Sequence, residues 1–197
     1  MKNSIKVLIS IVTISMYGMS VKAQNAKTGI YLTEQDYRSN KLTYVLGDHD
    51  KLQLNEFLGG ENVNLVYQGK KVKLSKNEIF GYRLNNQDFR FYHNEAYKIL
   101  DTAGFLLYSA EKLSEQGKGY KPVEQYFYST NTTRPVLELT IENLWNSFPA
   151  QIGFRYSLQN YFNKDTDLAG YDKLSHQYKI KYLYFQETQA KATHAAL

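Results

Sequence analysis

Residues 63–74 read Val-Asn-Leu-Val-Tyr-Gln-Gly-Lys-Lys-Val-Lys-Leu. Apolar and polar side chains alternate before and after segment 68–71, which has the glycine and polar residues of a tight turn. Alternation with a period of two places the apolar side chains of both halves on one face of a β-hairpin. The stretch therefore predicts antiparallel β-structure with one face in the core.

The chain on both sides of this hairpin continues the pattern. Residues 41–58 alternate in the same way around a polar turn at 47–50, which predicts another hairpin. Thr33 and Asp36 approximate the capping box of a short helix through Tyr37. Further strands are expected in short aromatic-rich runs, the last of them after a polar loop: 79–84, 89–93, 97–100, 105–108 and 126–128. We therefore expect residues 28–130 to form a largely antiparallel, twisted sheet or sandwich.

The region after Pro135 fits two periods. Apolar residues recur at helical spacing over 141–148 and 154–162, but alternation at the strand period is also present. We favour short helices because Thr140 can cap one and Pro149 can end it. Asp165 or Thr166 could cap another short helix.

The last patterned segment is 178–185, where aromatic and aliphatic residues alternate with lysines. This pattern predicts a C-terminal strand that returns to the sheet, and residues 187–197 are expected to form a flexible tail. The fold class is thus α+β: a single domain over 24–186, with short C-terminal helices and a returning C-terminal strand.

Residues 1–23 have the features of a secretory signal peptide. Lys2 and Lys6 precede an apolar stretch of about 15 residues, too short for a membrane-spanning helix, which needs ~20. Small residues at Val21 and Ala23 predict cleavage before Gln24, and a retained anchor is the alternative. We therefore expect an exported, periplasmic or surface-associated protein with no transmembrane segment after cleavage.

Composition excludes several kinds of protein. The full chain of 197 residues has no cysteine, which rules out a disulfide-stapled protein, a zinc–cysteine module and a cysteine nucleophile. The formal charge of +5 falls to +2 without the signal segment, which holds three lysines and no acid, so nucleic acid is not an expected partner. The 18 tyrosines are the one positive indication of function.

The chain resembles a group of uncharacterised secreted proteins from Gram-negative bacteria. The resemblance lies in segment 28–33 (Thr-Gly-Ile-Tyr-Leu-Thr) with Asp36-Tyr37, in segment 76–82 (Lys-Asn-Glu-Ile-Phe-Gly-Tyr), and in Leu168, Tyr171 and Asp172 before segment 178–184. It implies export and a shared fold over most of the mature chain. It implies no activity.

Candidate chemistry is sparse. Asp48-His49-Asp50 has the residues of a metal or acid–base site, which would suit a hydrolase, but also those of a hairpin turn. Asp101-Thr102-Ala103-Gly104 departs from the aspartic protease motif and predicts a turn, although it also resembles a bacterial O-glycosylation signal. The lysines at 70, 71, 73 and 76 suit a solvated hairpin face or, alternatively, an anionic envelope polymer or lipid surface. We expect no cofactor and no metal.

Aromatic side chains alternate with polar ones in several strands, so neighbouring rings lie on opposite faces of the sheet. Either helices within 140–172 cover the second face, or that face stacks sugars or binds a protein. We hypothesise a non-enzymatic binding protein for a glycan or an envelope protein, with Tyr82, Phe91, Tyr126 and Tyr128 as ligand-binding residues. The tyrosine content and the alternation also leave open a small outer-membrane β-barrel.

Overall fold

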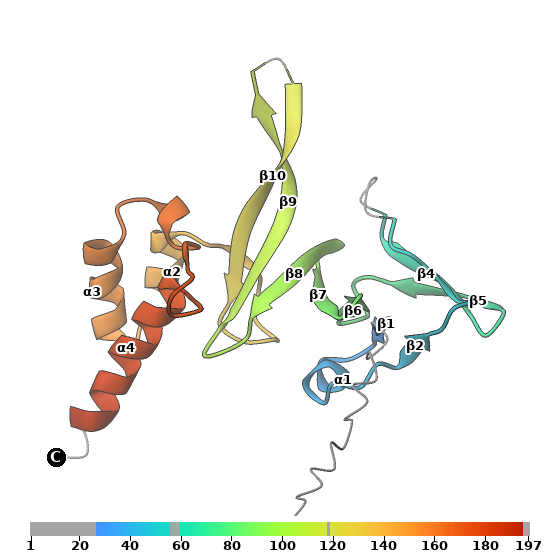
Figure 1. Ribbon diagram of the computed structural model, residues 1–197, viewed down its shortest axis with the longest axis horizontal. Coiled ribbons are helices and arrows are strands. Elements are labelled where there is room, and N and C mark those ends of the chain that lie inside the picture. Colours follow the sequence, from blue (N-terminus) through green and yellow to red (C-terminus); the bar gives the residue numbers. More distant parts are fainter. Residues whose placement is uncertain (1–26, 56–59, 118, 195–197) are drawn as a thin grey trace, which may run out of the picture.

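The computed structural model describes residues 27–55, 60–117 and 119–194 (Figure 1). The expected signal peptide at 1–23 lies outside these residues. Within them, no helix is both long and apolar enough to cross a membrane.

The main layer is an eight-stranded sheet in which every pairing is antiparallel, as the sequence predicts. Its strands, in spatial order, are β11 (Leu137–Glu138), β10 (Gly119–Ser129), β9 (Leu106–Gln116), β8 (Glu95–Asp101), β7 (Gln87–Tyr92), β6 (Gly81–Leu84), β1 (Thr28–Tyr31) and β2 (Tyr44–Leu46). The sheet is open, with β11 and β2 at its edges.

Two smaller sheets and five helical segments complete the fold. A three-stranded sheet contains β3 (Lys51–Gln53), β4 (Asn62–Tyr67) and β5 (Lys70–Ser75), and a two-stranded ladder contains β12 (Tyr171–Asp172) and β13 (Gln177–Tyr178). The helical segments are α1 (Glu34–Arg38), α2 (Ile141–Ser147), α3 (Ile152–Tyr161), the 3₁₀ turn η1 (Asp165–Asp167) and α4 (Lys179–His194).

The hairpin at 63–74 is confirmed as β4 and β5. Val63 lies opposite Leu74 and Leu65 opposite Val72, and both residues of the tight turn, Gln68 and Gly69, have positive φ angles. The prediction of a hairpin at 41–58 is wrong. Its two halves pair with other strands, β2 with β1 and β3 with β4. Three-residue strands gain few ladder bonds from each other, so each adds to the edge of another strand instead.

Both faces of the main sheet carry buried cores. The alternation of aromatic and polar residues in the sequence did not decide whether the second face would be buried. Tyr108 and Phe127 of β9 and β10 belong to a core on the inner face, which also holds Tyr31 of β1. The outer face is covered by the helices at one end and by the three-stranded sheet at the other, where Tyr82 and other residues of β1, β6 and β7 pack against β4.

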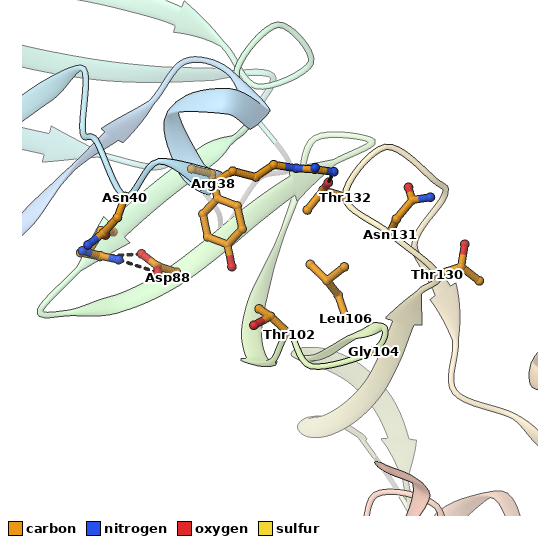
Figure 2. A pocket seen from close by; sticks show the side chains of 11 residues that line it. Arg38, Asn40, Asp88, Thr102, Gly104, Leu106, Thr130, Asn131 and Thr132 are labelled. Atoms are coloured by element: carbon orange, nitrogen blue, oxygen red, sulfur yellow. Dashed lines mark hydrogen bonds and ion pairs between the residues drawn. The ribbon is translucent and has the colours of Figure 1, made fainter. Parts of the chain in front are cut away.

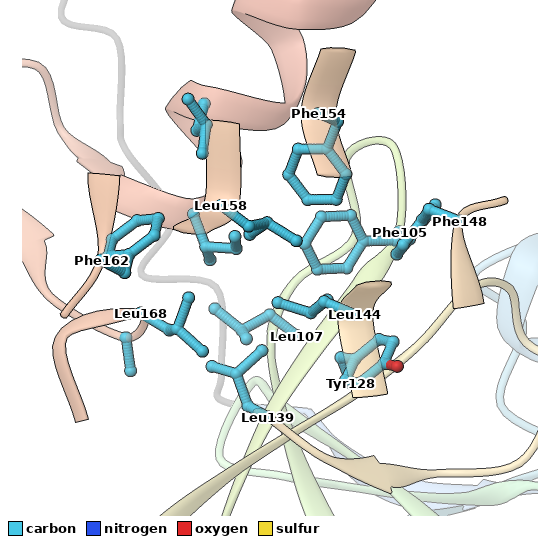
Figure 3. Packing of buried hydrophobic residues seen from close by; sticks show 13 residues of the cluster. Phe105, Leu107, Tyr128, Leu139, Leu144, Phe148, Phe154, Leu158, Phe162 and Leu168 are labelled. Atoms are coloured by element: carbon cyan, nitrogen blue, oxygen red, sulfur yellow. The ribbon is translucent and has the colours of Figure 1, made fainter. Parts of the chain in front are cut away.

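The helical layer confirms the helices expected after Pro135. Thr140 caps α2 by accepting a hydrogen bond from the backbone N–H of Asn143. Three aromatic rings meet at the end of α2, where the ring centre of Phe148 lies 5.5 Å from that of Phe105, in the loop before β9, and 5.4 Å from that of Phe154 in α3 (Figure 3). This core joins the helices to β9 and β10.

The predicted C-terminal strand is wrong: all but its first residue lie in α4. Ile180, Leu183 and Tyr184, at helical spacing, pack into the core with Phe105 and Phe154, and Lys181 is also fully buried. The apolar residues of this segment fit the strand period as well as the helix period. It forms a helix because its apolar side then packs against the apolar surface of α2 and α3. Residues 187–194 continue this helix, although the sequence predicted a tail there.

The polar loop expected before residue 126 is instead part of a long hairpin. β9 and β10 have 11 residues each and pair from Leu106 with Ser129 to Gln116 with Gly119. Their outer half projects beyond the rest of the sheet as a two-stranded arm (Figure 1).

Candidate functional site

Three of the four proposed ligand-binding residues are core residues. Tyr82 and Phe91 pack together beneath the three-stranded sheet, with ring centres 5.3 Å apart, and Tyr128 lies under the helices with its hydroxyl 2.6 Å from that of Ser147. Tyr126 is half-buried and donates to Glu124. These rings therefore stabilise two separate cores and do not form a common exposed face.

Turn chemistry accounts for Asp48-His49-Asp50. The carboxylate of Asp50 accepts hydrogen bonds from the backbone N–H groups of Gly47 (3.0 Å) and Gln68 (2.7 Å), and these bonds lower its pKa. Through the bond to Gln68, this turn is tied to the β4–β5 turn. Among the residues that the structure describes, no three His, Asp or Glu side chains are grouped closely enough to hold a metal ion.

The predicted turn at 101–104 is also confirmed. The Asp101 carboxylate accepts the backbone N–H of Ala103 at 2.8 Å. On the core side, the buried ammonium of Lys181 donates to the carbonyl oxygens of Ala103 (2.8 Å) and Phe105 and lies 3.6 Å from Asp101. Lys181 therefore fixes the loop between β8 and β9 from below.

That loop forms one wall of a pocket of about 450 Å³, which we call the α1 pocket (Figure 2). Its other walls come from α1 with the residues after it, from β6 and β7, and from loop 130–132. The lining residues are Tyr37, Arg38, Asn40, Arg83, Asp88, Thr102, Gly104, Leu106, Thr130, Asn131 and Thr132.

The charged side chains of the α1 pocket are already paired with protein groups. Arg83 makes a two-pronged ion pair with Asp88, at 2.6 and 2.7 Å, and Asp88 also accepts from the hydroxyl of Tyr31. Arg38 bonds Glu34 and Thr132, which joins α1 to the loop after β10. We infer that the polar side chains of this pocket mainly hold together segments that are distant in the chain.

A second pocket, of about 520 Å³, lies in the helical layer and has exposed tyrosines on its rim. We call it the tyrosine pocket. It is lined by Tyr161, Phe162, Asp167, Asp172, Ser175, Gln177, Lys179 and Tyr182. Its two rim rings, Tyr161 and Tyr182, are 62% and 48% exposed, although Phe162 and Leu183, the residues that follow them in the chain, are buried.

Helix geometry explains how these rings reach the pocket. Tyr161 is the last residue of α3, whose Phe154 and Leu158 face the core. Tyr182 lies on α4 between the buried Lys181 and Leu183, three residues after Lys179, so Lys179 and Tyr182 share a face. The burial of Lys181 therefore sets the rotation of α4 that presents Tyr182 to solvent.

The polar groups of the tyrosine pocket come from η1 and the β12–β13 ladder. The Asp172 carboxylate accepts the backbone N–H of Leu174 at 2.8 Å, and this bond is the main cause of its lowered pKa. Asp172 pairs across the ladder with Gln177. With Asp167 and Lys179, the pocket combines acceptors, an amide and an ammonium around two accessible aromatic faces.

Comparisons of the chain with models of protein families, with curated proteins and with solved structures found no match. The case for a function therefore depends on the geometry of the pockets and surfaces.

Three of the four aromatic residues that the sequence suggested as ligand-binding are buried, whereas Tyr161 and Tyr182 are exposed. The aromatic runs of the sequence lie mostly in strands, and their rings fill the cores. The helical pattern of the sequence does not mark Tyr161 as exposed, because seven positions after Phe154 it falls on the apolar side of the helix. The exposure of Tyr182 depends on α4 being a helix, which the sequence pattern did not predict.

Proposed function

We propose that this protein is an exported, non-enzymatic binding protein that holds a carbohydrate in the tyrosine pocket. The observation that carries the proposal is the pair of exposed rings, Tyr161 and Tyr182, on the rim of a pocket that also presents carboxylate, amide and ammonium groups. The N-terminal signal pattern supports export, and the resemblance to secreted proteins agrees with it.

Sugars suit this combination because a pyranose ring has both apolar and polar sides. Its C–H groups stack on the face of an aromatic ring, and its hydroxyls donate to carboxylates and accept from amides and ammonium groups. A volume of about 520 Å³ lies within the ordinary range of small-molecule sites, roughly 300–1,000 Å³.

The charge of the pocket narrows the ligand class. Asp167 and Asp172 provide two negative charges and Lys179 one positive charge. The balance disfavours uronic acids and phosphorylated sugars, because like charges repel in a partly enclosed site. Neutral sugars and amino sugars are therefore the expected ligands.

A glycan array probed with the mature protein tests the proposal. Neutral and amino-sugar oligosaccharides are expected to retain the protein, and uronic-acid oligosaccharides of the same length are expected not to. Retention only by acidic glycans, or by none of the array, would argue against a carbohydrate site of this kind.

A further inference from the structure

The β9–β10 arm has two open edges. β8 pairs with β9 no further along the arm than Ser109, and β11 reaches only Phe127 and Tyr128 of β10. Beyond these residues, no strand in the described part of the chain covers the arm. A projecting surface of this kind is available to another molecule.

One face of the arm is acidic. Glu111 lies directly opposite Glu124, and Glu115 opposite Tyr120, while Leu113 opposite Pro122 lies between these pairs. Leu113 and Tyr120 are 73% and 70% exposed. We call these six residues the acidic arm face.

The glutamates of this face have no ion-pair partner within residues 27–55, 60–117 and 119–194. Like charges directly opposite each other in an antiparallel pair are unfavourable, so Glu111 and Glu124 weaken the isolated arm. The arm's own lysines do not relieve this, because Lys112 lies on the other face, where its ammonium pairs with Glu95. A positive partner against the acidic arm face would relieve the repulsion.

A matching basic face lies on the three-stranded sheet. Lys51 and Lys71 flank Val66 in one row, and Gln53, Asn64 and Lys73 form the next row. Alternate residues of the same strands point inward, so this face points to solvent. We call these six residues the lysine face, and none of them is acidic.

The two faces belong to different parts of the molecule: the arm projects from the middle of the main sheet, and the β4–β5 region lies at one end (Figure 1). We propose that the acidic arm face of one copy binds the lysine face of a second copy. One copy of the pair then keeps an unused lysine face and the other an unused acidic arm face, so the contact is head-to-tail and propagates into chains or closes into rings. Leu113 and Tyr120 supply apolar contact beside the charges.

The contact is expected to be weak and sensitive to salt. A small, largely charged interface is typical of transient association, and exposed charges are screened over about 3 Å at 1 M salt against about 30 Å at 0.01 M. Sedimentation velocity on the mature protein should therefore show species that grow with concentration at low salt and disappear at high salt.

Charge reversal tests which faces are involved. The variant Glu111→Lys/Glu115→Lys/Glu124→Lys and the variant Lys51→Glu/Lys71→Glu/Lys73→Glu should each sediment as a monomer at low salt. Mixed together, they should associate, because the lysine arm of the first meets the glutamate face of the second. A variant with all six reversals should self-associate like the original protein. A protein reversed at Lys41 and Glu78, outside both faces, serves as the control and should behave like the original.

Circular dichroism of each variant shows whether it is folded. If one reversed variant does not fold, the six-reversal variant and the salt dependence of the original protein still show whether the acidic arm face binds the lysine face. A monomeric original protein at low salt, or a reversed pair that stays monomeric when mixed, would overturn the proposal. So would retention of the original protein on phosphatidylglycerol vesicles through the lysine face without self-association.

Discussion

The ammonium group of Lys181 on α4 donates a hydrogen bond to the backbone carbonyl of Ala103, 78 residues earlier in the chain, at 2.8 Å. It also lies 3.8 Å from the centre of the Phe105 ring. A single buried cation thus joins the C-terminal helix to the loop between β8 and β9. This link fixes a wall of the α1 pocket and orients Tyr182 toward the tyrosine pocket.

Lys181 should give the stability of the protein a distinct pH dependence. Burial lowers its pKa to about 8 from an ordinary 10.5, and the carboxylate of Asp101 offsets part of this shift. Between pH 8 and 10.5 the unfolded chain holds a proton that the folded chain has released, so the free energy of unfolding rises with pH by about 3 kcal/mol over the full window. Below pH 8 Lys181 is protonated in both the folded and the unfolded chain, so it gives the free energy of unfolding no pH dependence there.

The measurement is urea unfolding of the original protein and of Lys181→Met between pH 7 and pH 10.5. The difference in unfolding free energy between them should shift in favour of the original protein as the pH rises. Buried tyrosines act in the opposite direction, since burial raises the pKa of Tyr37 to about 12. Their contribution is common to both proteins and cancels. A difference that stays constant with pH would contradict the assignment.

Gly104 should be the glycine least tolerant of substitution in the turns with positive φ. Its φ is +74°, and an added Cβ would lie 2.7 Å from the Tyr184 ring. Gly104→Ala should lower the free energy of unfolding by about 2–4 kcal/mol, from backbone strain and from displacement of Tyr184.

Gly69→Ala is the matched control. Gly69 has nearly the same φ, +76°, but an added Cβ there meets no described atom within 4 Å. Gly69→Ala should lower the free energy of unfolding by about 1 kcal/mol, from backbone strain alone. Equal losses for the two variants would show that the contact with Tyr184 is unimportant.

Arg90 should be essential to the inner core of the sheet. Its guanidinium is buried and donates to the hydroxyls of Tyr108 (3.0 Å) and Ser129 (3.2 Å) and to the carbonyl of Arg134 (3.0 Å). Arg90→Lys cannot reproduce this fork, so we expect a loss of about 2–3 kcal/mol in denaturant unfolding. Arg134→Lys, at an exposed position, should change stability by less than about 0.5 kcal/mol. A loss of the same size in both variants would contradict the role given to Arg90.

Local signals in the sequence predicted local structure well. Thr33 and Asp36 form the expected capping box of α1, Thr140 caps α2, and segment 63–74 forms its hairpin. The caps join residues three positions apart and the hairpin pairs residues no more than 11 apart around one tight turn, from Val63 with Leu74 inward, so turn and cap chemistry is sufficient.

The errors concern partners that are distant in the chain. The alternation at 178–185 suits a strand, but the apolar surface of α2 and α3 makes it a helix and buries Lys181. Packing of the three-stranded sheet buries Tyr82 and Phe91, and the helical packing leaves Tyr161 and Tyr182 exposed. Periodicity shows that a face is apolar, but it does not show which other element covers that face.

Calorimetric titration with trisaccharides of glucose, mannose and N-acetylglucosamine tests the carbohydrate site most directly. At least one should bind the original protein, and Tyr161→Ala and Tyr182→Ala should each weaken that binding by about tenfold, or about 1.4 kcal/mol. Tyr156→Ala is the matched control, because Tyr156 lies on the same helix as Tyr161 with the same 62% exposure but outside the pocket. Unchanged binding in the control is the predicted result. Binding by none of the trisaccharides, or binding unaffected by Tyr161→Ala and Tyr182→Ala, would contradict the carbohydrate site.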